Sequence, residues 1–248
     1  TNNNVGVTVG GAVAAGLGKT QDTNALAGAF SVHVDARNVE ARMRGVTLEA
    51  AGVTVGAKDE ATVVNVAVGG AGSSKGKVTV AGSVAVAVLT GGTLTEVEDA
   101  TIDAGTVTLS AKDLSTTVGV GGAVSINLDM TQGYGVGIGI AANAVDRDAL
   151  TRVLGATSIT TGAFAATSEA RAAIYGFGIS AGVGKTGVAG SVSVNVITGG
   201  AKTLIEGSEG AQITINATAV NVQATEDNQI YSLAGAITGG QQGAIGGA

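Results

Sequence analysis

Apolar and polar residues alternate along most of the chain. In SVSVNVI (191–197), every second residue is a valine, so the valines share one side of an extended chain and Ser193 and Asn195 share the other. The segments VTVAGSVAVAV, VTLSA and ITINA follow the same rule. A period of two residues is typical of β-strands. The best candidate for a helix, 149–156, is short, so the pattern predicts an all-β protein.

Glycine takes part in this alternation, as in GVGIGIA (135–141). Glycine weakens an isolated strand, but it lets a second backbone approach closely. We therefore expect sheets that stack tightly on one another.

The chain repeats with a period of about 54 residues. One set of similar segments begins at Gly28, Gly82, Gly139 and Gly190, and a second set begins at Val53, Val107, Phe164 and Val220. We interpret 1–248 as a single repeat array, with units at about 5–61, 62–115, 116–171 and 172–229 and a partial fifth unit at 230–248. Since the fifth unit stops part-way, we expect a piece or a subunit of something longer.

Strand repeats joined by glycine-rich turns predict a β-solenoid, a rod similar to a parallel β-helix. With roughly 18–27 residues per coil, the chain would form on the order of 9–14 coils and a rod of roughly 45–65 Å. Each repeat would then hold two or three coils. A stack of antiparallel β-hairpins is the alternative that the sequence leaves open.

Two Gly-Lys-Thr segments, 18–20 and 184–186, resemble the end of a phosphate-binding loop. Such a loop needs a glycine five residues before the Gly-Lys pair and a helix after it. The position of that first glycine is occupied by Val13 in one copy and by Ile179 in the other. The residues after 184–186 alternate as in a strand and show no helical pattern. We therefore predict a polar turn that recurs between strands, and no nucleotide as a partner.

Composition narrows the picture further. The chain has three Phe, three Tyr and no Trp, so we expect an interior built from Val, Ala, Ile and Leu. Charged residues make up 13% of the sequence, and the formal net charge is −6. The sequence has no basic patch of the kind that binds nucleic acid, so we do not expect nucleic acid as a partner. The absence of cysteine is compatible with a secreted bacterial protein. No signal segment opens the sequence, so any export signal would lie outside it.

Few residues are candidates for chemistry. The only histidine, His33, is predicted to face solvent from a strand. Glu96 and Glu98 share one strand face, as do Asp146 and Asp148, and calcium is the cofactor that their oxygen ligands would suit. No known calcium-loop pattern accompanies them, and Asp146-Arg147-Asp148 would also be satisfied by internal pairing, so solvated turns are the competing interpretation. We predict no catalytic and no cofactor-binding residue, and a ladder of Tyr175 on Tyr231 along one face of the solenoid.

Two segments, GSVSVNVITGGAKTLIEGSEGAQITINATAVNVQATED (190–227) and GSVAVAVLTGGTLTEVEDATIDAGTVTLSAKD (82–113), carry a family resemblance. They resemble the repeat unit of giant bacterial secreted or surface proteins, the filamentous-haemagglutinin-like and leukotoxin-like β-strand repeat proteins. The resemblance extends over the whole chain and is weakest in 116–171. It implies an extracellular, adhesive or filamentous role, and it supplies no catalytic residue.

The expected function is thus a structural or adhesive module of an extracellular or cell-surface bacterial protein or filament. Its expected partner is itself, by head-to-tail or edge association, together with host or surface ligands. A β-helical enzyme acting on polysaccharide is one alternative, with Glu96 or Asp146 in a groove. A segment of an outer-membrane β-barrel is another, against which the shortage of aromatic residues argues.

Overall fold

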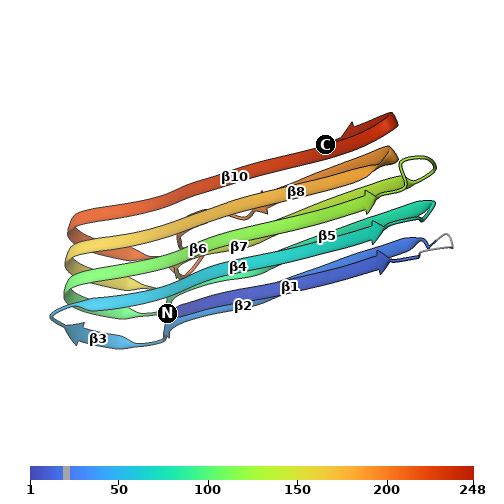
Figure 1. Ribbon diagram of the computed structural model, residues 1–248. Helices are drawn as coiled ribbons and strands as arrows, with labels where there is room; N and C mark the ends of the chain where they lie inside the picture. Colours follow the sequence, from blue (N-terminus) through green and yellow to red (C-terminus); the bar gives the residue numbers. More distant parts are fainter. Residues whose placement is uncertain (19–22) are drawn as a thin grey trace.

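The computed structural model describes residues 1–18 and 23–248, and it is a β-solenoid of parallel strands (Figure 1). In chain order the strands are β1 (Asn2–Gly16), β2 (Ala25–Arg44), β3 (Thr47–Ala50), β4 (Val53–Ser73), β5 (Val78–Glu98), β6 (Thr101–Asn127), β7 (Tyr134–Leu154), β8 (Ser158–Thr198), β9 (Ala201–Glu206) and β10 (Thr214–Gly247). The part of the chain that the structure describes holds no helix able to span a membrane. The predicted fold class is confirmed.

The coils form two layers. The first layer contains β1, β4 with β3, β6, the first part of β8, and β10; the second contains β2, β5, β7, the last part of β8, and β9. All pairings between these named strands are parallel, so the alternative of antiparallel hairpins is wrong. Figure 1 shows the coils stacked from β1 and β2 to β10, as a broad plate.

Each repeat forms one coil, and not two or three. Val53 pairs with Val107, Val107 with Phe164, and Phe164 with Val220. Equivalent residues of successive repeats therefore lie on adjacent strands of the sheet. The coil is long because its strands run without interruption, as in the 21 residues of β5. Strands about 4.8 Å apart give the first layer, five strands deep, a height of only roughly 20–24 Å. The predicted coil count and rod length are therefore wrong.

The register also corrects one alignment. Gly82 pairs with Ile138, which pairs with Gly190, so the segment aligned from Gly139 is displaced by one residue. A slip of one residue exchanges the two faces of a strand. Asn143 therefore continues the position of Ala87.

The plate has two dissimilar halves. The core half comprises 35–60, 91–114, 146–171 and 199–227, and a conventional apolar core fills the space between its layers. Its largest fully buried side chains include Phe164, Ile102, Leu109 and Ile159. Lysine and glutamate face outward here, as Lys58, Glu60, Lys112 and Glu169 do, in the manner of an ordinary soluble sheet.

The glycine half comprises 1–18, 23–34, 61–90, 115–145, 172–198 and 228–248, and its two layers lie very close together. A Cβ added to Gly121 would lie 2.0 Å from the carbonyl oxygen of Ile140, and one added to Gly135 would lie 2.1 Å from that of Val183. The predicted tight stacking is confirmed. Over most of this half Gly, Ala, Ser, Thr, Asn and one His face inward and the valines face outward. The predicted Val, Ala, Ile and Leu interior holds only next to the core half, where Val63, Leu89, Val145 and Ile174 are buried, and it is wrong for the rest.

Polar corners join the layers at the end of the glycine half. Ser74–Lys77 and Leu128–Gly133 are such corners, as the recurring turn predicts. At Gly184-Lys185-Thr186, β8 passes directly from one layer to the other, and the Lys185 amide donates to the Gly133 carbonyl at 2.7 Å. In the other Gly-Lys-Thr copy, Lys19 and Thr20 lie outside the described residues.

Candidate functional site

A buried network of charges lies between the layers where the two halves meet. Arg147 of β7 points inward and bonds to Asp113 through two contacts of 2.9 Å, and it also bonds to Asp59. Arg37 of β2 forms bonds of 2.6 and 2.7 Å to Asp35 and approaches Asp59 at 3.7 Å. Three carboxylates and two guanidinium groups therefore share one space between the layers, in which Asp59 links the two arginines.

The titration of the network follows from its burial. Burial raises the pKa of Asp113, and the bonds from Arg147 oppose that rise without cancelling it. For Arg147, burial acts to lower the pKa, but the bonds from Asp113 and the charge of Asp59 outweigh it, so the pKa is raised. Arg147 is thus a fixed positive charge that holds two carboxylates from neighbouring coils together.

Glycine makes room for these arginines. Gly91 pairs with Arg37 on one side and with Arg147 on the other, so the two guanidinium groups have no third side chain between them. Its φ is 112°, and a Cβ there would lie 1.8 Å from the carbonyl oxygen of Arg37. Gly91-Gly92 and Gly199-Gly200 are therefore positions where the second layer bends around the network.

His33 does not face solvent as predicted, but lies between the layers at the edge formed by β1 and β2. Its Nδ1 is 2.8 Å from the Thr8 hydroxyl. The same inward column continues through Ala87 to Asn143 and Asn195, where the Asn143 amide donates to Asn195 at 2.8 Å. The prediction failed because it assumed that the valines of this strand face the interior and that the residues between them face solvent. His33 belongs to a polar ladder inside the plate.

The calcium candidates do not form a common site. Glu96 lies on the outer face of the second layer, between Arg42 and Arg152 in the register, and accepts bonds from Arg152 at 2.5 Å and from Arg44 at 2.8 Å. Burial acts to raise the pKa of Glu96, but the bonds from Arg44 and Arg152 prevail and lower it. Glu98 pairs with Arg44 at 2.9 Å.

The other two candidates, Asp146 and Asp148, are exposed on β7, while Arg147 between them points inward, so the predicted pairing within this triplet is wrong. Asp148 accepts a bond of 2.9 Å from the Gly200 amide. Within residues 1–18 and 23–248, no three side chains of His, Cys, Asp or Glu are grouped to hold a metal ion.

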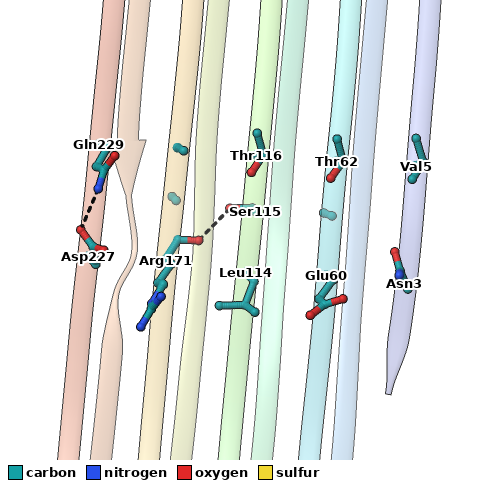
Figure 2. Close-up of a pocket in the computed structure, with 13 residues that line it drawn as sticks. Asn3, Val5, Glu60, Thr62, Leu114, Ser115, Thr116, Arg171, Asp227 and Gln229 are labelled. Atoms are coloured by element: carbon teal, nitrogen blue, oxygen red, sulfur yellow. Dashed lines mark hydrogen bonds between the residues drawn. The ribbon is translucent and has the colours of Figure 1, made fainter.

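A shallow groove of about 550 Å³ crosses the outer face of the first layer at the same level as the buried network. The side chains that line it come from β1, β4, β6, β8 and β10, the strands of this layer (Figure 2). Glu60, Arg171 and Asp227 are its charged residues. Glu60 pairs with Lys58 at 2.5 Å and Arg171 with Glu169 at 2.8 Å.

The groove contains neither of the carboxylates considered for an enzyme. Asp146 pairs with Thr90, and Glu96 lies six residues further along β5, which is about 20 Å of extended chain on the opposite layer from the groove. The two carboxylates of a glycosidase lie roughly 5–9.5 Å apart. Glu96 and Asp146 are therefore too far apart to act as such a pair.

The tyrosine ladder is confirmed. Tyr175 and Tyr231 stack on the outer face of the first layer, with ring centroids 5.0 Å apart and an angle of 4° between the ring planes. Their columns continue with Phe177 and Leu233 two residues further along each strand. The aromatic side chains are thus part of an apolar outer surface.

Comparison with known proteins gives no relative: no family model, no curated protein and no solved structure matches the chain.

Proposed function

We propose that the chain is a structural module of an extracellular bacterial surface protein or filament, which associates with further copies of itself at the open edges of its sheets. One observation carries this proposal: the inner face of β10 is apolar and uncovered. Val220 is 58% exposed, Val222 46% and Ile230 48%. Their partners one coil below, Phe164, Ala166 and Ile174, are at most 1% exposed.

A further coil would bury this surface and pair the free edge of β10. An edge strand of 34 residues with unpaired amides and carbonyls is a template for another strand. Solenoid coils gain stability from their neighbours, because no single coil buries its own apolar face. Association at this edge therefore extends the interactions that already hold the coils together.

Charge at the two ends supports the same arrangement. Glu226 of β10 points toward the Gly199–Gly200 bend, at the level of the buried network, and is exposed. At the opposite end, Arg37 is at the same level with 22% of its side chain exposed. Within the plate, Arg147 bonds to Asp59 of the preceding coil, so an arginine that reaches a carboxylate one coil away is already part of this architecture.

Electron microscopy and light scattering of the protein in buffer test the proposal. We expect fibres or extended stacks that grow with concentration. Val222→Lys places a charge on the inner face of β10 and should abolish association, whereas Gln223→Lys, on the outer face of the same strand, should leave it unchanged. Monomers that persist at high concentration would refute the proposal, as would equal effects of the two variants.

A further inference from the structure

The glycine half exposes apolar side chains on both of its outer surfaces. On the first layer the exposed apolar residues are Val5, Val7, Val9, Val13, Val68, Val124, Ile126, Ile179, Tyr231, Leu233 and Ile237. On the second layer they are Leu26, Phe30, Val32, Val34, Ile138, Val192, Val194 and Val196. Side chains that a soluble sheet would place in its core therefore face outward from both sides of one plate.

This apolar band has a defined height. In β6 it runs from Val118 to Ile126, and in β5 from Val80 to Val88; at ~3.3 Å per residue each segment spans about 26 Å. The hydrocarbon core of a bilayer is about 30 Å thick. The strands of both layers run side by side, so the band has a similar height on both faces (Figure 1).

Charged residues stop at the limits of the band. In the described part of the glycine half, Asp, Glu, Lys and Arg occur only in the corners between layers, at Lys75, Lys77, Asp129 and Lys185. On the other side of the band, Glu60 and Asp146 face outward and the buried network begins. A plate that only had to stack on its neighbours would not need a band so free of charge.

Small residues fill the interior of the band, with clusters of alanine beside serine, threonine and asparagine, and its backbone is paired. Ser125 donates to the Thr79 carbonyl at 2.9 Å, and Asn65 donates to the Val86 carbonyl at 2.6 Å. Parallel ladders on both sides of each inner coil satisfy the backbone groups. Internal pairing of every backbone group, with apolar side chains outside, is what a lipid environment requires.

We propose that the glycine half inserts into a lipid bilayer, with the corners at the far interface and the core half outside the near one. A second copy stacked face to face would cover one of the two apolar surfaces, whereas hydrocarbon covers both at once and accounts for the height of the band. The inference rests on the proposed association, because the open edges of β1, β2 and β10 would leave backbone groups unpaired in hydrocarbon until further coils cover them.

Flotation with vesicles of neutral phosphatidylcholine is the first test, because neutral lipid removes attraction by charge from a chain of net charge −6. We expect the protein to float with the vesicles. The double variant Val124→Lys, Val194→Lys places one charge on each outer face, at residues 45% and 50% exposed, and should bind at least about tenfold more weakly. Thr108→Lys, outward on β6 in the core half, is the matched control and should bind like the unaltered chain.

A topology measurement gives a second readout. The chain has no cysteine, so Gln132→Cys in a corner and Thr54→Cys on the core half each provide a single thiol. With a membrane-impermeant maleimide outside the vesicles, Cys at 54 should react and Cys at 132 should be protected. With the reagent inside the vesicles, the thiol at 132 should react.

The outcomes separate the two proposals. Fibres in buffer that neither float nor protect the thiol at position 132 would overturn bilayer insertion and leave self-association standing. Flotation with protection, but without fibres in buffer, would support insertion and refute association in solution. Plates stacked through their valine faces in place of vesicle binding would overturn insertion, as would equal binding by the double variant.

Discussion

The core half and the glycine half are built by the same strands, yet they place the same residue types on opposite faces. In β6, Val107 and Leu109 point inward and are fully buried, whereas Val124 and Ile126 point outward and are more than 40% exposed. Between them, Gly119 and Gly121 take the inward positions and bring the layers together. Alternation thus sets the period of a strand, and the size of the residues on each face decides which face becomes the interior.

The buried charges mark the change from one half to the other. Arg147 and the carboxylates of Asp59 and Asp113 lie between two apolar clusters. One is the core around Phe164 and Leu109, and the other contains Val63, Leu89, Val145 and Ile174, beyond which glycine brings the layers together. A buried ion pair needs all its partners, because each isolated charge would be costly. The junction is therefore fixed by pairing, and each half is fixed by packing.

The largest expected contrast is between two phenylalanines of β8. Phe164 is 1% exposed in the core half, and Phe177 lies on the outer face of the glycine half. Phe164→Ala should lower the free energy of unfolding by about 3–5 kcal/mol, because it leaves a cavity, and Phe177→Ala should lower it by less than about 1 kcal/mol. Urea unfolding of both variants, followed by circular dichroism, measures this. Equal losses would mean that the outer face of the glycine half is packed as a core.

The junction should show the next largest effect. Arg147→Met keeps an apolar stem but leaves Asp113 without its partner and Asp59 with only the 3.7 Å contact to Arg37, and should cost about 3 kcal/mol at neutral pH. Arg171→Met is the control, because Arg171 is 57% exposed on the outer face and its partner Glu169 is 22% exposed, and it should cost less than about 1 kcal/mol.

The loss in Arg147→Met should also depend on pH. The pKa of Asp113 in the folded chain lies above its ordinary value, so its contribution to stability is greatest below the unfolded pKa and is lost as pH rises through the folded pKa. Removal of Arg147 takes away the group that holds this pKa down. The deficit should be largest near pH 7 and should shrink as the pH falls toward 4. A deficit that is constant with pH would show that packing, and not charge, explains the loss.

The sequence was sufficient for the fold class, the tight stacking, the corners and the tyrosine ladder, because these follow from local alternation, from glycine and from the repeat, in which Tyr175 and Tyr231 occupy matching places. The coil length did not follow, since the apolar pattern in β5 continues through Gly91-Gly92 and the repeat does not show where a strand turns. Nor did the charge network. Arg147 lies between two aspartates in sequence, and only the pairing of distant coils shows that its partners are Asp59 and Asp113.

The smallest contrast concerns two adjacent glycines of β6. Gly121 points inward, where a Cβ would meet the Ile140 backbone at 2.0 Å, and Gly122 points outward, where its nearest neighbour would be a methyl group of Val68 at 3.7 Å. Gly121→Ala should cost about 2 kcal/mol because the backbone of the facing layer has to move, and Gly122→Ala should be neutral or slightly stabilising. The urea midpoints of the two variants provide the comparison. If Gly121→Ala unfolds at the same midpoint as Gly122→Ala, the layers can separate at little cost, and close approach is not what turns the valines outward.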